Sequence, residues 1–244
     1  MSRIVIAAPM KSGSTFVSRV LAKYLAVADY KPFFGWGWQD HILLPETLNA
    51  SPDSFVMQAH LKPSRPNRAS IIKHDLQVIC LWRNLGDVVI SLAEHIANES
   101  HEIPVCYIPD RKAFLINDIQ VQYTFLVQMA IPWYLAFWEL WHSQRMLVDV
   151  RFFHFEKMLD NPMFFFSEIV SVVQPLSVVD PNRLQKCMEW ADGKYARKNV
   201  GMRGRSAELL SEGNKRLIER TIAQYCSLQA QSSLLSELPW VITP

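Results

Sequence analysis

The sequence predicts a single α/β domain with a central, mostly parallel sheet flanked by helices. Two observations carry this prediction. Residues 4–8 form an apolar run that leads through a polar turn into an amphipathic helix ending near Leu25, and residues 78–82 form another before a helix over 84–98. Continuous apolar runs are typical of parallel strands buried on both faces. With 244 residues, half of them hydrophobic, we expect one domain over residues 1–244.

The first strand, turn and helix resemble a phosphate-binding loop and predict an anion site. A cation, hydroxyl groups and the free N–H groups of a helix start suit phosphate or sulfate. Glycine lets the backbone approach such a ligand closely. The turn consists of Lys11, Ser12, Gly13, Ser14 and Thr15, with Phe16 next on the helix.

The turn departs from the Walker A pattern GxxxxGK[ST]. Ala8 stands where the first glycine belongs, and Ser14 stands where the phosphate-binding lysine belongs, while a lysine occurs earlier, at Lys11. The strand at residues 78–82 is followed by Arg83 rather than by a magnesium-binding carboxylate. We therefore expect a shorter anionic group bound without metal. A P-loop kinase of a small metabolite, dependent on ATP and magnesium, is the alternative.

The later elements follow from periodicity and from turn residues. In order, the sequence predicts an aromatic loop at 30–41, a strand at 54–59, an irregular segment at 62–66 and a short helix end at 71–75. It then predicts two core helices, or one kinked at Pro132, within 117–145, a strand at 147–155 and helices at 162–173 and 211–229. Polar residues interrupt the apolar stretch at 117–145, so no membrane span is expected.

Composition limits the class of partner and the compartment. A net charge of +2 argues against a nucleic-acid-binding protein. The cysteines are widely spaced, without a CxxC pair, so neither a zinc site nor a disulfide framework is expected. The sequence begins directly with the first strand and shows no secretory signal. Reduced thiols in the cytoplasm are the predicted state.

Four stretches, in this order, resemble the signatures of one enzyme family. PMKSGSTF at residues 9–16 is similar to PKSGTTW, and QAHLKP at 58–63 is similar to a T-H-L-P motif. CLWRNLGDVVISL at 80–92 resembles the second signature, and HFEKMLDNP at 154–162 resembles Y-E-D-M-x-x-N-P. The family is that of sulfotransferases that use 3′-phosphoadenosine 5′-phosphosulfate (PAPS), which release 3′-phosphoadenosine 5′-phosphate (PAP). The resemblance implies a soluble, cytosolic type.

The resemblance implies a catalytic pair. His60 follows the strand at 54–59, and ligands of open parallel sheets bind beyond the carboxyl ends of strands, so it is expected to face the turn at Gly13. As a histidine it suits a general base, and Lys11 is expected to stabilise the leaving phosphate. His41 is expected to be a structural polar residue.

The resemblance also implies how the cofactor is held. Arg83 and Ser91 match residues that bind the 3′-phosphate, and Phe155 matches a tyrosine near the adenine, so stacking is retained. The family expects R-K-G followed by G-D-W near the C-terminus, but here the segment reads ARKNVGMRGRS. We expect the basic turn of Arg203, Gly204 and Arg205 to replace it. The pair Arg197 and Lys198 is the alternative.

The acceptor is expected to be a small molecule with a hydroxyl or amine group. Four aromatic side chains of the loop at 30–41 either line its pocket or pin the loop to the core. They are Phe33, Phe34, Trp36 and Trp38. A catalytically inactive binding protein of the same fold is a further alternative, because Met10 lies within the first signature and the C-terminal signature is altered.

Overall fold

A computed structural model describes residues 2–31, 33–34, 40–103, 105–195 and 202–241. The chain forms two compact units, which we describe separately. The first comprises Met1–Trp36, Asp40–Trp82 and Gln144–Lys198, and the second comprises Gly37–Gln39, Arg83–Ser143 and Asn199–Pro244. The prediction of one domain over residues 1–244 stays a prediction.

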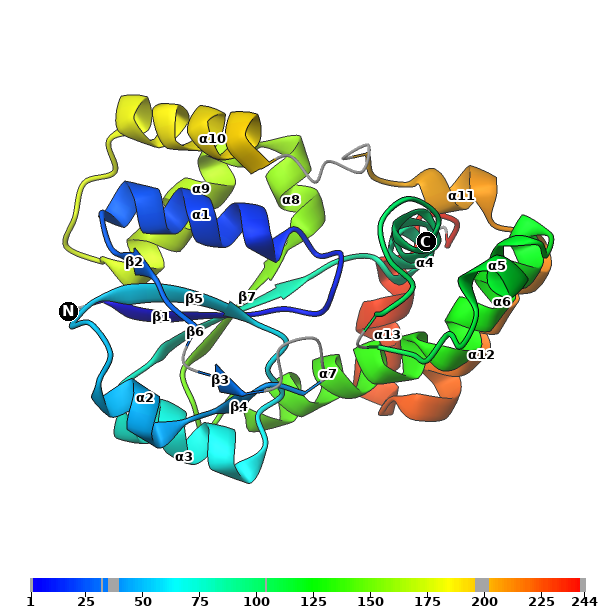
Figure 1. Ribbon diagram of the computed structural model, residues 1–244, viewed down its shortest axis with the longest axis horizontal. Coiled ribbons are helices and arrows are strands. Elements are labelled where there is room, and N and C mark those ends of the chain that lie inside the picture. The colour runs from blue at the N-terminus through cyan, green and yellow to red at the C-terminus, as the bar shows by residue number, and fades with distance from the viewer. Residues whose placement is uncertain (1, 32, 35–39, 104, 196–201, 242–244) are drawn as a thin grey trace. The chain divides into compact units, whose positions relative to one another are not determined.

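The first unit is built on a five-stranded sheet in the order β2-β5-β1-β6-β7 (Figure 1). All four strand pairs are parallel. The bounds are β1 Arg3–Ala7, β2 Ala28–Asp29, β5 Phe55–Ala59, β6 Gln77–Trp82 and β7 Val150–His154. The predicted α/β class with a central, mostly parallel sheet is therefore confirmed. A separate antiparallel pair joins β3 (Phe33–Phe34) to β4 (Ile42–Leu43).

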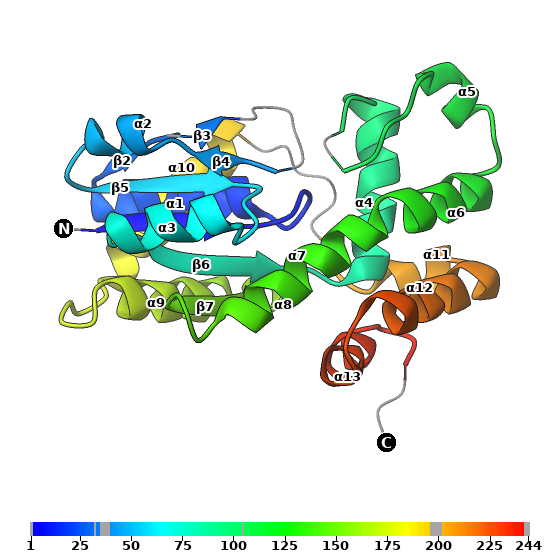
Figure 2. The same cartoon turned by 90° about the horizontal axis from the view of Figure 1, so that it is seen from below.

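Helices cover both faces of this sheet (Figures 1 and 2). One face carries α1 Ser14–Leu25, α9 Pro162–Val173 and α10 Pro181–Tyr195, and the other carries α2 Pro45–Asn49 and α3 Arg65–Lys73. The short helix α8, Phe155–Asp160, follows β7 directly. Strands with both faces covered need apolar side chains on both, which explains the continuous run at residues 4–8.

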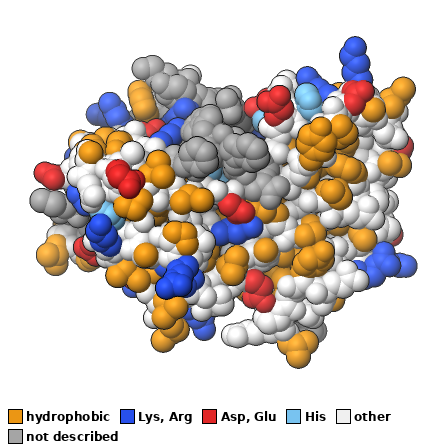
Figure 3. All heavy atoms as spheres, turned by 60° about the horizontal axis from the view of Figure 1, so that its bottom comes forward, with side chains coloured by type: hydrophobic (Ala, Val, Ile, Leu, Met, Phe, Trp, Pro, Cys, Tyr) orange, Lys and Arg blue, Asp and Glu red, His pale blue; other side chains and the backbone are white. Residues whose placement is uncertain are grey.

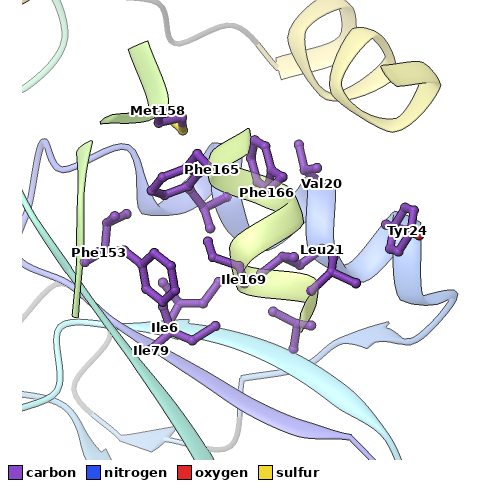
Figure 4. Close-up of a cluster of buried hydrophobic side chains, with 14 of the residues drawn as sticks. Ile6, Val20, Leu21, Tyr24, Ile79, Phe153, Met158, Phe165, Phe166 and Ile169 are labelled. Carbon is purple, nitrogen blue, oxygen red and sulfur yellow. The ribbon is translucent and has the colours of Figure 1, made fainter. Parts of the chain in front are cut away.

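The main core lies between the sheet and the helices α1 and α9, which pack on one of its faces (Figure 4). Leu21 of α1 and Ile169 of α9 meet above Ile6 and Ile79 of the sheet. All four side chains are at most 1% exposed. Burying each such side chain contributes about 1.5–3 kcal/mol, so this core fixes α1 and the turn before it on β1.

The described part of the second unit is mainly helical. Its helices are α4 Leu85–Asn98, α5 Arg111–Leu115, α6 Ile119–Met129, α7 Ile131–Gln144, α11 Arg205–Leu209, α12 Glu212–Tyr225 and α13 Leu228–Ser236. The side chain of Asn84 caps α4 by accepting from Asp87 N, and Ser211 caps α12 by accepting from Asn214 N. Asn214 also accepts from Thr124 Oγ1 at 2.8 Å, which ties α12 to α6.

Four sequence predictions need correction. The segment at 62–66 is not wholly irregular, because α3 begins at Arg65 and holds Pro66 in its first turn, where no N–H is needed. The strand predicted at 147–155 is shorter, and Phe155 starts α8 instead. The aromatic loop contains β3. The last predicted helix divides into α12 and α13, since α12 ends before Cys226.

Two predictions about helices are confirmed. The stretch at 117–145 forms two helices, with Pro132 in the first turn of α7. Helix α9 has the predicted bounds, and all four cysteines are free thiols. Among the described residues, no helix combines the length and apolarity needed to cross a membrane. On the face shown in Figure 3, acidic and basic side chains are scattered among hydrophobic ones.

Candidate functional site

The turn between β1 and α1 has the backbone geometry of an anion-binding loop. Gly13 precedes the first helical residue with a φ of +75°, and Lys11 also has a positive φ, of 61°. The amide groups of Phe16 and Val17 already bond to Gly13 O, at 3.0 and 3.1 Å. The N–H groups of Ser14 and Thr15, which precede them, have no acceptor within the helix, so they suit an anion.

Gly13 is required here for two reasons. A side chain is strained at its φ, and a Cβ atom placed on it would lie 2.4 Å from Cε2 of Phe155. The Phe155 ring is only 7% exposed and packs against the glycine. It therefore supports the turn. The prediction that it stacks on adenine stays a prediction.

The side chain of Ser12 indicates that this turn binds a ligand. Its side chain is fully buried, and its Oγ has no hydrogen-bond partner among the described residues. An unpaired buried hydroxyl costs about 1–3 kcal/mol, which an acceptor oxygen of a bound group would remove. Ser14 is also buried, whereas Thr15 is exposed. The residues present thus fit a phosphate or sulfate group.

His60 lies beside the start of the turn. It follows β5, whose last residue, Ala59, pairs with Ala7, and its Nδ1 is 2.7 Å from the carbonyl oxygen of Ala8. A carbonyl can only accept, so Nδ1 carries the proton and Nε2 keeps its lone pair. Burial lowers the pKa of His60, and the bond to Ala8 only partly opposes this shift. A neutral imidazole with a basic Nε2 results.

A second histidine is bonded to the first. His60 N donates to Nδ1 of His41 at 2.9 Å, and His41 N donates to His60 O at 3.2 Å. Burial, the neighbouring His60 and Lys31 lower the pKa of His41 to about 3. The side chain of Asn67 bonds to the backbone on both sides of this pair, at His41, Leu43 and Lys62. Sequence reasoning missed Asn67, which lies between the predicted irregular segment at 62–66 and the predicted helix end at 71–75.

In the second unit, Ser91 lies in α4, and Arg83 lies just before that helix. Asp87 and Ser91 are four residues apart, so they lie on one face of α4, whereas Arg83 precedes the helix cap Asn84. Asp87 accepts hydrogen bonds from Gly204 N at 2.6 Å and from Ser206 N and Oγ at 3.0 and 2.8 Å. The predicted basic turn is thus anchored at Asp87, on the face of α4 that carries Ser91.

The two arginines of this turn differ in their surroundings. Both terminal nitrogens of Arg205 bond to the carboxylate of Glu94, whereas Arg203 is exposed. Gly204 has a φ of +74°, as a tight turn requires. The alternative pair, Arg197 and Lys198, lies outside the described residues. Sequence reasoning missed Glu94 and Ser206, which are distant in sequence from their partners.

The predicted acceptor pocket falls largely outside the described part of the chain. Trp36 and Trp38 are not described, and Phe33 and Phe34 are described only as backbone, in β3. Within the described residues, no group of three or more metal-ligating side chains gathers. Metal independence and the aromatic pocket therefore stay predictions.

Comparison with known families identifies the class. Residues 1–174 match the sulfotransferase domain, so the chain belongs to the sulfotransferase family. The predicted recognition of a sulfotransferase enzyme is therefore confirmed.

Solved structures share the fold. The crystal structure of mouse sulfotransferase SULT7A1 complexed with PAP has a TM-score of 0.68 at 13% identity, covering 96% of this chain and 87% of that one. The crystal structure of a sulfotransferase from Alicyclobacillus acidocaldarius is 12% identical, and the match covers 95% of this chain and 99% of that one. Its TM-score is 0.41, which is too low to support an argument about the fold. No curated protein sequence matches the chain.

Proposed function

We propose that the protein transfers the sulfuryl group of PAPS to a hydroxyl or amine of a small-molecule acceptor. His60 is the general base, and Lys11 stabilises the leaving phosphate. The observation that carries the proposal is the bond from His60 Nδ1 to Ala8 O, which leaves a basic nitrogen beside an anion-binding turn. Family membership and the SULT7A1 complex with PAP support the choice of PAPS.

His60 removes the acceptor's proton. Nε2 takes this proton as the acceptor oxygen forms its bond to sulfur, and the bond between sulfur and the phosphate oxygen breaks. The Nδ1–H donated to Ala8 O then stabilises the imidazolium through the same carbonyl. PAPS supplies the sulfuryl group, and PAP leaves. The proton finally passes from His60 to solvent.

Lys11 and the start of α1 stabilise the negative charge that develops on the leaving phosphate. A lysine in this turn supplies a full positive charge, and the first N–H groups of α1 supply aligned dipoles. The residues proposed to hold the phosphosulfate part are Lys11, Ser12, Gly13, Ser14, Thr15 and Phe16. The buried, unpaired Ser12 hydroxyl and the contact of Gly13 with Phe155 support this assignment.

The 3′-phosphate is assigned to Arg83, Ser91 and the basic turn. Within that turn we propose Arg203 as the direct ligand, because its side chain is exposed to solvent. Gly204 and Arg205 then shape the turn. Phe155 is retained as a candidate for the adenine side. An arginine fork suits a phosphate, since it forms two parallel charge-assisted hydrogen bonds.

The remaining assignments extend the same proposal. We propose that the reaction needs no metal, that the enzyme acts in the cytoplasm, and that it works on a small molecule rather than on nucleic acid. The four free cysteines support a reducing compartment.

Calorimetric titration with PAP and with ADP tests the cofactor assignment. We expect tighter binding of PAP, and a loss of about 1.5–3 kcal/mol of PAP binding in Arg83→Ala, the range for a charge-assisted hydrogen bond. Arg151→Ala is the matched control, because Arg151 is exposed and paired with Asp149. Equal affinity for PAP and ADP would contradict the proposal, and tighter binding of ATP with magnesium would favour a kinase.

A further inference from the structure

We infer that His41 and Asn67 are positioning residues that hold His60 in the tautomer and orientation of a general base. The inference rests on the proposed function, because it concerns the residue that takes the acceptor's proton. The two side chains are not proposed to contact the acceptor oxygen or the sulfur of PAPS. His41 bonds to the backbone N–H and C=O groups of His60, and Asn67 acts through the backbone of His41 and Lys62.

The bond between His41 and His60 is reciprocal. His60 N donates to His41 Nδ1 at 2.9 Å, His41 N donates to His60 O at 3.2 Å, and the ring centroids are 5.3 Å apart. His41 is 4% exposed, so this pairing is shielded from water. Its Nδ1 accepts an N–H and is therefore unprotonated, which the burial of the ring favours. The Nδ1 atom of His41 thus accepts a hydrogen bond from His60. It does not compete with His60 for the proton of the acceptor substrate.

Asn67 fixes the segment that carries His41. Its side chain is 2% exposed, and the amide nitrogen donates to His41 O at 3.0 Å and to Lys62 O at 2.8 Å. Its oxygen accepts from Leu43 N at 3.0 Å. One buried amide therefore ties the strand β4 to the residues just after His60. An aspartate of the same shape would lose both donated bonds and face two carbonyl oxygens.

These contacts decide where Nε2 of His60 points. The N–H and C=O groups of His60 are both held by His41, and Nδ1 is held by Ala8 O. With the backbone and one ring nitrogen fixed, the other ring nitrogen has one direction available. A base is effective only when its nitrogen is within hydrogen-bond reach of the proton, so a small rotation is costly.

The test compares His41→Phe with His41→Asn in the full chain. Phenylalanine keeps a planar ring but no acceptor, whereas asparagine places an acceptor oxygen near the position of Nδ1. Nitrogen-15 NMR of the His60 side chain reports its tautomer. We expect the Nδ1–H form in the wild type and in His41→Asn, and a mixture of both tautomers in His41→Phe.

Kinetics provide the second readout. We expect kcat to fall about 10-fold or more in His41→Phe, with KM for PAPS within about 2-fold, and to recover largely in His41→Asn. Asn67→Asp should show the same fall in kcat as His41→Phe. If His41→Phe fails to fold, the kcat of Asn67→Asp tests the positioning role.

These experiments distinguish failure of the positioning role from failure of the proposed function. A His60 that keeps one tautomer and a wild-type kcat in both His41→Phe and Asn67→Asp would overturn the positioning role. A wild type that binds no PAP and transfers no sulfuryl group would instead overturn the proposed function. The NMR comparison would still decide whether His41 and Asn67 set the tautomer of His60.

Discussion

Nδ1 of His60 and the carbonyl oxygen of Ala8 lie 2.7 Å apart, so the residue after β5 is bonded to the residue after β1. This bond joins the candidate base to the chain that leads into the anion-binding turn. It also assigns the ring proton to Nδ1, because a carbonyl oxygen cannot donate. The pH dependence of the reaction follows from this arrangement.

Activity should persist below the pH at which an ordinary histidine becomes protonated. Burial lowers the pKa of His60 from its usual 6.5, and a general base must be neutral to act. As the pH falls, the free enzyme therefore loses its base only below pH 6.5. A profile of kcat/KM against pH should place the acidic limb below that value. An acidic limb above pH 7 would contradict the lowered pKa of His60.

His41 makes the stability of the first unit depend on pH. Its pKa is about 3 when folded and 6.5 when unfolded, so between these values the unfolded chain binds the additional proton. The contribution is therefore complete above pH 6.5 and is lost as the pH falls toward 3. Each pH unit removes up to about 1.4 kcal/mol from the free energy of unfolding.

Urea unfolding of the wild type and His41→Asn at pH 7, 6 and 5 checks this prediction. The variant has no titrating group at position 41, so its free energy of unfolding should fall less steeply. Parallel curves for the two proteins would show that His41 is protonated as easily when folded as when unfolded.

Two glycines with the same φ should respond differently to alanine. Gly13 and Gly204 have φ values of +75° and +74°, but a Cβ on Gly13 meets Phe155 at 2.4 Å, whereas a Cβ on Gly204 meets nothing within 4 Å. Both substitutions carry the backbone strain of about 1–2 kcal/mol. Gly13→Ala adds overpacking of about 1–3 kcal/mol. Denaturant unfolding should therefore rank Gly13→Ala as clearly the less stable, and equal losses would argue against the contact with Phe155.

Asp87 should control the order of the basic turn. Asp87→Asn keeps the shape but replaces one accepting oxygen by an NH₂ group, so at least one bond to Gly204 or Ser206 is lost. Such a loss costs about 1–3 kcal/mol. Hydrogen exchange of the peptide covering residues 202–210 should become faster, and PAP should bind more weakly.

Glu94→Gln is the matched control for Asp87→Asn. It weakens the pairing with Arg205 but leaves the backbone N–H groups of Gly204 and Ser206 bonded to Asp87. It should accelerate exchange less. Faster exchange in Glu94→Gln than in Asp87→Asn would assign the anchoring of the turn to Arg205 instead.

Local patterns in the sequence were sufficient where the physical cause is local. The turn at Gly13 and the bounds of α9 follow from apolar spacing and from Pro162 in the first helical turn. The prolines within 62–66 predict an irregular segment, but α3 begins at Arg65, because a helix accepts proline in its first turn.

Partners distant in sequence required the structure. Asp87 and Gly204 are 117 residues apart, and no spacing rule relates them. The role of Asn67 depends on backbone groups of His41 and Leu43, which a pattern of side chains does not reveal. Long-range hydrogen bonds of this kind depend on how elements pack, and packing is only partly encoded in local periodicity.

Transfer of radiolabelled sulfate from PAPS, measured against acceptors of graded pKa, tests the central claim most directly. The wild type should be active in EDTA. His60→Ala should lose about 10²-fold or more while still binding PAP, with partial recovery for the more acidic acceptors, which need less help in losing a proton. Lys11→Ala should lower both turnover and PAPS affinity, without that dependence on acceptor pKa. A His60→Ala enzyme with the rate and profile of the wild type would contradict the account.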